Sequence, residues 1–277
     1  MKNGLAVPFI KWVGGKRQLL NEISLYIPKK INTYFEPFVG GGAVLFHIQP
    51  EKALINDFNS DLITTYKIIR NNPFELLESL KKHQNTSEYF YNIRDKDRDS
   101  KEYRNISDIE RASRLIYLNK TCYNGLFRVN SSGQFNTPFG SYKNPNIVNE
   151  PTIKAVSQYL NNSKVEIITG DFEKAVNDAK EGDFVYFDPP YDPVTDTANF
   201  TGYTECGFGR TEQERLKGLC DELNIKGVKF LLSNSSTEYI RSLYKDYEQV
   251  IVKAKRSLNA NGKGRGEVDE LLIRNYK

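Results

Sequence analysis

Short apolar runs alternate with amphipathic runs along most of the chain, and this alternation predicts an α/β protein. Residues 184–187, Phe-Val-Tyr-Phe, are apolar at every position, which is typical of a central strand that is buried on both faces of a sheet. The apolar spacing predicts helices over 18–26, 43–48 and 211–223. Further strands are expected over residues 33–36, 53–55, 165–169, 228–233, 248–255 and 268–274.

The pattern changes between about residues 59 and 150, where the strands give way to predicted helices over 61–69, 73–81 and 108–118. The alternating charges from Arg94 to Asp99 predict a solvated face. The stretches 119–130 and 134–145 mix amides, aromatic rings and isolated basic residues with turn residues. They indicate either a base-reading surface or a hairpin-rich insertion.

Composition places the chain among globular proteins, since 39% of its 277 residues are hydrophobic and 27% are charged. No apolar run is long enough for a signal peptide or a membrane span. The chain has three cysteines without CxxC spacing, which argue for a reducing cytoplasm and against a structural metal site: Cys122, Cys206 and Cys220. The net charge of +4 permits a nucleic-acid partner without proving one.

The polarity changes abruptly after the central strand, at residues 188–191, Asp-Pro-Pro-Tyr. The two prolines stiffen this turn, so it can aim the Asp188 carboxylate, the Pro189 carbonyl and the Tyr191 ring into one cleft. Two acceptors beside an aromatic face suit a planar amine such as the amino group of adenine. Its lone pair is delocalised, and two acceptors on its N–H bonds would localise that pair towards an electrophile. The alternative is a plain turn with a capping aspartate.

A glycine run at 40–42 follows the predicted strand 33–36 and precedes a helix, which allows a ligand to approach the backbone closely. Asp57 ends the next strand, where a carboxylate can accept hydrogen bonds from ribose hydroxyls, or can cap the following helix. The segment Gly14-Gly15-Lys16 is not a P-loop, because Ile10 and Arg17 stand where that motif needs Gly and Ser or Thr.

Taken in order, these motifs resemble those of the Dam-type DNA adenine methyltransferases over nearly the whole chain. The resemblance rests on residues 11–16, 36–42, 123–128, 135–140, 188–191 and 268–272. It implies an S-adenosylmethionine-dependent methyltransferase sheet of seven strands, the last two forming a hairpin, built from residues 1–58 and 149–277. Residues 59–148 would be an inserted, mainly helical target-recognition domain.

The resemblance also implies site residues. S-adenosylmethionine would be bound by Trp12, Lys16, Phe38, Gly40, Gly41, Asp57, Asp171, Phe172 and Asp188. A flipped-out adenine would stack on Tyr191 and meet Asp188 and Pro189, with no metal required. Double-stranded DNA would be contacted by Lys11, Tyr123, Asn124, Leu126, Arg128, Pro138, Tyr142 and Lys143. The commonest target of the family is GATC, and Arg128 matches an arginine that reads guanine. Ser141 departs from the pattern, because relatives often carry a basic residue there.

The sequence also bears on other activities that use related motifs. Methylation of RNA or of a protein glutamine uses related motifs, but the separate insertion argues against both. Methylation of a cytosine ring carbon is excluded, because it needs a thiolate that normally follows a proline, and no cysteine here does. A non-catalytic DNA-binding module is disfavoured by the intact motif at 188–191, and no nuclease-type carboxylate cluster stands out. The sequence leaves open a cognate restriction endonuclease, a role in repair or gene regulation, and a phage origin.

Overall fold

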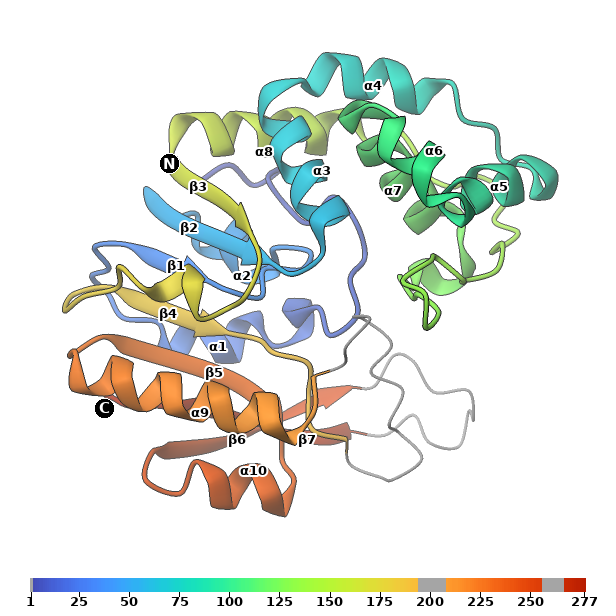
Figure 1. Ribbon diagram of the computed structural model, residues 1–277. Coiled ribbons are helices and arrows are strands. Elements are labelled where there is room, and N and C mark those ends of the chain that lie inside the picture. Colours follow the sequence, from blue (N-terminus) through green and yellow to red (C-terminus); the bar gives the residue numbers. More distant parts are fainter. Residues whose placement is uncertain (1, 194–207, 256–266) are drawn as a thin grey trace.

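The computed structural model describes residues 2–193, 208–255 and 267–277, and in this part of the chain seven strands form one sheet (Figure 1). The strand order is β3-β2-β1-β4-β5-β7-β6; β1 to β5 run parallel, and β7 is antiparallel to both β5 and β6. This confirms the expected α/β sheet with a final hairpin. The strands are β1 Tyr34–Glu36, β2 Lys52–Asp57, β3 Lys164–Thr169, β4 Phe184–Phe187, β5 Lys229–Ser235, β6 Glu248–Lys255 and β7 Glu267–Arg274.

Strand β4 lies at the centre of the sheet, and all four of its residues are buried. Phe184 and Tyr186 belong to the apolar core on one face, whereas Val185 and Phe187 belong to the core on the other. Helices cover both faces, which explains why this strand has no polar position. The first polar side chain that the strand can present is therefore that of Asp188, immediately after its carboxyl end.

The helices divide between the two faces of the sheet (Figure 1). One face is covered by α1 Leu20–Tyr26, α2 Ala43–Ile48, α3 Ser60–Asn71 and α8 Glu150–Asn162, and the other by α9 Arg210–Ile225 and α10 Glu238–Leu243. The helices α4 Pro73–Lys81, α5 Ser87–Arg94, α6 Ser100–Asn105 and α7 Asp108–Thr121 gather beyond α3. Short 3₁₀ turns are η1 Lys16–Gln18, η2 Asp95–Arg98, η3 Tyr123–Gly125 and η4 Lys174–Val176.

The helical region between β2 and β3 shares its core with the sheet. Tyr66 on α3, Leu76 on α4, Phe90 on α5 and Leu115 on α7 lie in the same buried cluster as Tyr34 of β1. Polar side chains cap the first turns of α3, α5, α6 and α7, although the expected helices were predicted from apolar spacing and not from these caps. A capping box between Ser107 and Glu110 starts α7, for example. Helices α5, α6 and α8 were not expected from the pattern.

The alternating charges from Arg94 to Asp99 do not form a purely solvated face. The Asp97 carboxylate lies 2.8 Å from Arg114 Nη2 on α7, and the two side chains are only 11% and 7% exposed. Asp97 also accepts the backbone N–H of Phe135 at 2.8 Å. The expectation was wrong for Asp97, because sign alternation carries no information about a partner that is distant in sequence. This carboxylate joins α7 to the loop that follows it.

The turn after β4 is held by two buried amides. Gln213 Nε2 on α9 donates to the Pro190 carbonyl at 2.8 Å, and Asn234 Nδ2 on β5 donates to Gln213 Oε1 at 3.0 Å. Asn234 Oδ1 in turn accepts the backbone N–H of Asp192 at 3.2 Å. Both amides are at most 1% exposed. The backbone is thus held on each side of Tyr191.

Asn234 and Ser235 therefore lie inside β5 and hold this turn. The N-cap of α10 is Thr237, whose side chain accepts the backbone N–H of Ile240. Cys122 and Cys220 are buried and free, whereas Cys206 lies outside the described residues. None of the described helices has the length and hydropathy needed to cross a membrane.

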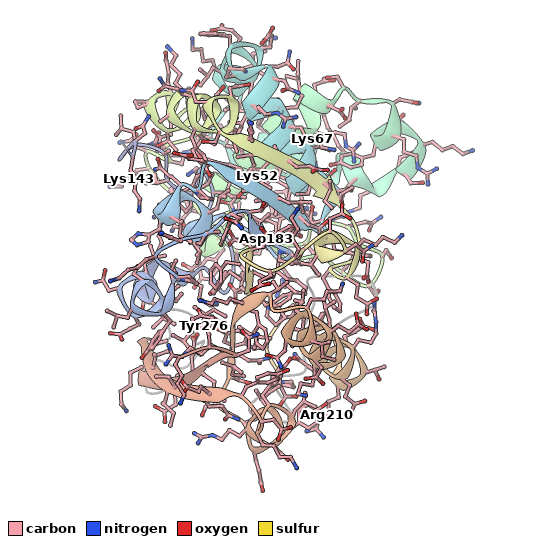
Figure 2. All side chains as sticks on the ribbon, turned by 90° about the vertical axis from the view of Figure 1, so that its left-hand side faces the viewer. Lys52, Lys67, Lys143, Asp183, Arg210 and Tyr276 are labelled. Atoms are coloured by element: carbon pink, nitrogen blue, oxygen red, sulfur yellow. The ribbon has the colours of Figure 1, made fainter. Side chains whose placement is uncertain are left out.

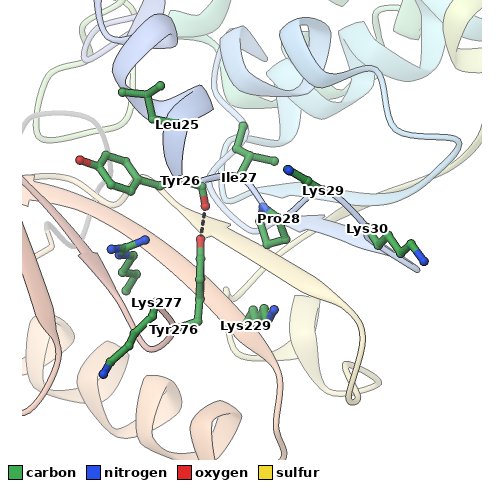
Figure 3. A pocket seen from close by; sticks show the side chains of 10 residues that line it. Leu25, Tyr26, Ile27, Pro28, Lys29, Lys30, Lys229, Tyr276 and Lys277 are labelled. Carbon is green, nitrogen blue, oxygen red and sulfur yellow. Dashed lines mark hydrogen bonds between the residues drawn. The ribbon is translucent and has the colours of Figure 1, made fainter.

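The amino-terminal edge of the parallel strands faces the viewer in Figure 2, where Lys52, Asp183 and Tyr276 are labelled. Asp183 is 3% exposed and accepts the backbone N–H groups of Thr33 and Lys180, each at 3.0 Å. The Tyr276 hydroxyl donates to the Tyr26 carbonyl beside a pocket of about 420 Å³ (Figure 3). These contacts join the strand starts and the end of the chain, on the side away from Asp188.

The two buried amides allow a test of this arrangement. In Asn234→Ala, the Asp192 N–H and the Gln213 amide oxygen lose their buried partners, so we expect the free energy of unfolding to fall by about 1–3 kcal/mol. Urea denaturation followed by circular dichroism measures it. Asn162→Ala, at an exposed position at the end of α8, is the control and should stay within about 0.5 kcal/mol of the original protein. Equal effects of both changes would contradict the proposed importance of the amides.

Candidate active site

The Asp188 carboxylate at the end of β4 forms a buried ion pair with Lys16. Lys16 Nζ lies 2.7 Å from Asp188 Oδ1, and the two side chains are 5% and 19% exposed. The ammonium also donates to the Gly14 carbonyl at 2.6 Å and lies 4.6 Å from the centre of the Tyr191 ring. Burial raises the pKa of Asp188 to about 6, while Lys16 opposes this and the Glu270 carboxylate adds to it.

Tyr191 is fixed at its hydroxyl group. The hydroxyl donates to Glu270 Oε2 of strand β7 at 2.7 Å. Burial, and then the nearby charges of Asp188 and Glu270, raise the pKa of Tyr191 well above its ordinary value, so the hydroxyl stays protonated. Among the described residues, no group donates a hydrogen bond to the carbonyl of Pro189. The Asp188 carboxylate and the Tyr191 ring thus lie close together, since both contact the Lys16 ammonium.

The glycine turn between β1 and α2 is held by the end of β2. Asp57 Oδ2 accepts the backbone N–H of Gly40 at 3.0 Å, and Oδ1 accepts that of Asn59 at 2.9 Å. Gly40 has a φ of 48°, in the left-handed region that favours glycine. The helix cap of α3 is Asn59, so the alternative role of Asp57 as that cap is wrong. Burial raises the pKa of Asp57 to about 6, and the two N–H groups oppose the rise.

Trp12 packs directly on this turn. A Cβ placed on Gly40 would come within 2.7 Å of Trp12 Cδ1, so any other residue there would clash with the indole. The indole also stacks on Phe127, with ring centres 4.8 Å apart and planes inclined by 24°. Trp12 is partly buried against the main core, so its indole both packs on that core and borders the glycine turn.

The end of β3 presents a second carboxylate near the turn. Asp171 is bound by Arg215 of α9, whose Nη2 lies 3.2 and 3.1 Å from the two carboxylate oxygens. The Arg215 guanidinium lies 4.9 Å from the centre of the Phe172 ring. Phe172 is 5% exposed and packs on Phe38 with ring centres 5.3 Å apart. The ends of β1, β2 and β3 thus carry two carboxylates beside an aromatic pair.

The residues expected to contact DNA surround the loop after α7. Tyr123 and Tyr142 are 57% and 37% exposed, and the bridges Cys122–Phe139 and Val129–Phe135 close the loop as an irregular hairpin. Four more of these residues are exposed: Asn124, Arg128, Pro138 and Lys143. Leu126 is partly buried. On this hairpin, Arg128 Nε donates to Asn136 Oδ1 at 2.8 Å.

The amino-terminal segment joins the two groups of residues. The backbone N–H of Lys11 donates to Asn119 Oδ1 at 2.9 Å, and Asn119 Nδ2 donates back to the Lys11 carbonyl at 2.7 Å. Lys11, next to Trp12, is therefore held against the end of α7. The structure thus places Trp12 and Lys16 at the strand ends and Lys11 beside the hairpin.

Sequence reasoning missed several residues at this edge. Lys120, in the last turn of α7, is partly buried and has no carboxylate partner in the described structure. Burial, and then the charges of Arg17 and Lys11, lower its pKa to about 8. Glu270 lies in a motif that the resemblance includes, but no local signal linked it to Tyr191. Gln213, Asn234 and Arg215 likewise meet the site only through the fold.

Comparison of the sequence with known proteins identifies the family. A family model for D12 class N6 adenine-specific DNA methyltransferases matches residues 12–258. The type II methyltransferase M1.LlaDCHI of Lactococcus lactis subsp. cremoris is 48% identical over 271 residues, covering 97% of this chain and 95% of that protein. The type II methyltransferase M.MjaIII of Methanocaldococcus jannaschii is 41% identical over 289 residues, covering 97% and 99%.

The DNA adenine methylase of Serratia marcescens is 36% identical over 270 residues, covering 95% of this chain and 96% of that protein. These matches confirm the resemblance drawn from the motifs, and with it S-adenosylmethionine as the methyl donor. In the described residues, no group of three or more His, Cys, Asp or Glu side chains is placed to hold a metal ion. The chain belongs to the D12 class N6 adenine-specific DNA methyltransferases.

Proposed function

We propose that this protein methylates the amino group of an adenine that is flipped out of double-stranded DNA, within the sequence GATC. The observation that supports this most directly is the position of the Lys16 ammonium. It is an N–H donor that contacts the Asp188 carboxylate at 2.7 Å and the Tyr191 ring at 4.6 Å. A stacked adenine amino group needs these same two contacts, so Lys16 would have to move when the base enters.

Asp188 and Pro189 would prepare the amino nitrogen for attack. Two acceptors on its two N–H bonds hold the lone pair out of the ring plane, and the anionic acceptor stabilises the positive charge that develops on nitrogen. S-adenosylmethionine supplies a methyl group made electrophilic by its sulfonium. Stacking on Tyr191 would contribute roughly 1–3 kcal/mol, which offsets the few kcal/mol that base flipping costs.

The residues at the strand ends fit this methyl donor. A ribose offers two hydroxyl donors and an adenine offers an amino group, and the carboxylates of Asp57 and Asp171 are matching acceptors. We assign the cofactor to these two residues, to Trp12 and Lys16, and to Phe38, Gly40, Gly41, Phe172 and Asp188. The packing of Trp12 on Gly40 would make the indole a wall of this pocket.

We propose that residues 59–148 serve as the target-recognition domain and that residues 1–58 and 149–277 form the catalytic domain. Arg128 and Tyr123 on the hairpin would face the bases, while Lys143 would contact phosphate. Arg17 and Lys120 add to the charge beside Lys11, which suits a DNA backbone. Because two relatives are named type II methyltransferases, we also propose a cognate restriction endonuclease for this enzyme, without requiring physical contact.

If Asp188 acts as an ionised acceptor, activity should be lost at acid pH. Because its pKa is raised to about 6, the carboxyl gains a proton and loses an acceptor as the pH falls through that value. We expect kcat/KM for DNA, measured with saturating S-adenosylmethionine, to fall by about tenfold per pH unit below about pH 6. Asp188→Ala should lower the rate by on the order of 10²–10³ at every pH.

Asp57 titrates in the same range and needs a separate control. Its protonation should weaken S-adenosylmethionine binding, which calorimetry across the same pH range measures without DNA. A profile of kcat/KM that stays flat down to about pH 5 would contradict the assignment of Asp188 as the ionised acceptor.

The role of Lys120 predicts an alkaline limit of DNA affinity. With its pKa lowered to about 8, the amine loses its charge as the pH rises through that value, so affinity for a labelled duplex should weaken above it. Lys120→Arg should remove this limit, because a guanidinium stays charged. Lys120→Gln should weaken binding at every pH. It should also reduce the slope of log affinity against log salt concentration by about one.

Fluorescence anisotropy at several salt concentrations measures these affinities. Lys164→Gln, at an exposed position at the start of β3, is the matched control and should bind like the original protein. If Lys120→Arg keeps the same alkaline limit, another group titrates and Lys120 does not contact phosphate.

The proposed target is tested by methylating a library of duplexes varied at each position of GATC and sequencing the products. Arg128→Ala should accept sites that are altered at one guanine-bearing position, because a bidentate arginine–guanine pair discriminates by about 1–3 kcal/mol. Lys143→Ala should slow all sites alike. Preference of the original protein for another tetranucleotide would refute GATC, and a uniform loss in Arg128→Ala would refute base reading by Arg128.

A further inference from the structure

Glu270 lies in the middle of β7, opposite Ser235 of β5 and Val252 of β6. Its Oε2 accepts the Tyr191 hydroxyl at 2.7 Å, although 79 residues separate the two in sequence. Glu270 is only partly buried, and no described cation forms an ion pair with it. The Tyr191 hydroxyl is therefore the one group in the described structure that this carboxylate binds.

The hydrogen bond completes the restraint on Tyr191. Gln213 and Asn234 hold the backbone on each side of this residue, but they do not limit rotation of its ring. An aromatic ring needs no hydroxyl to stack on a base, so the hydroxyl must be explained in another way. A bond between a phenol and a carboxylate is directional and charge-assisted, and it fixes where the far end of the ring lies.

We propose that Glu270 is a positioning residue for methyl transfer: by accepting the Tyr191 hydroxyl, it holds the ring at one angle beside Asp188. A base that stacks on this ring then presents its amino group to the Asp188 carboxylate, and the ring does not first have to rotate into place. This inference rests on the proposed function of Asp188 and Tyr191. In this role Glu270 contacts Tyr191, the side chain on which the base would stack, and does not contact the base itself.

The position of the carboxylate supports this role over a purely structural one. Glu270 lies on β7, the neighbour of β5, and Asn234 lies on β5. These two strands therefore both hold the turn at 188–192, β5 through the Asp192 backbone and β7 through the Tyr191 hydroxyl. The neighbouring residue Asp269 is exposed and lies 3.5 Å from Lys253, away from Tyr191. Two adjacent acidic residues on one strand thus make different contacts, and this gives a matched control.

The test compares variants by single-turnover methylation of a duplex that contains the preferred site of the protein. Glu270→Ala removes the acceptor and should slow methyl transfer by about 10- to 100-fold, the usual effect of losing a hydrogen bond to a charged group. Glu270→Gln keeps an amide oxygen that can accept the hydroxyl and should recover most of the rate. Asp269→Ala should react like the original protein.

Tyr191→Phe completes a double-mutant cycle with Glu270→Ala. Because each change removes the same hydrogen bond, the double variant should be no slower than the slower single variant. The loss should appear in the rate of transfer, while S-adenosylmethionine affinity by calorimetry and DNA affinity by anisotropy stay within about twofold. Circular dichroism and thermal unfolding show whether each variant is folded.

The outcomes separate this inference from the proposed function. If the original protein does not methylate adenine in DNA, or Asp188→Ala retains its rate, the proposed function fails. If those results hold but Glu270→Ala reacts like the original protein, or the two changes are additive, Glu270 does not position Tyr191. Should Glu270→Ala fail to fold, Tyr191→Phe and Glu270→Gln still decide: a loss in Glu270→Gln larger than that in Tyr191→Phe would overturn the inference.

Discussion

A carboxylate placed at the end of a strand that is buried on both faces needs a partner that offsets its loss of hydration, and this requirement organises the site. Asp188 meets it with Lys16, which comes from the far amino-terminal part of the chain. Removing one partner of a buried pair leaves an uncompensated charge and costs about 3–5 kcal/mol. The amino-terminal segment is thereby held on the central strand, with Trp12 beside the glycine turn and Lys11 beside the hairpin.

Local patterns predict the elements of this fold better than its long-range contacts. The bounds of α2 and α4 follow from apolar spacing alone, and the motif at 188–191 predicts that the Asp188 carboxylate and the Tyr191 ring lie close together. The partners of these groups were not predictable, because Glu270 and Gln213 meet the turn from other strands and helices. Apolar residues that recur every two positions in a strand, or every 3.6 positions in a helix, indicate which face is buried. They do not indicate which side chain from another element packs against that face.

Burial of charge is the second kind of information that the pattern lacks. Asp97 belongs to a run that has every local feature of a solvated surface, yet it pairs with Arg114 inside the helical region. Lys120 similarly resembles any lysine near a helix end, and only its burial beside two other cations distinguishes it. Packing decides whether such a charged side chain is buried. Burial is tolerated where the fold supplies a partner for the charge, or where a bound ligand can supply one.

Trp12 lies between Gly40 of the glycine turn and Phe127 of the hairpin, so one indole touches both halves of the proposed ligand surface. Any displacement of this ring that favours one ligand changes the affinity for the other, and linkage makes the two effects equal in free energy. Cooperativity between cofactor and DNA can thus arise without movement of a domain. It also means that Gly40 and Phe127 constrain each other as the sequence diverges, because a residue that shifts the indole at one contact must be matched at the other.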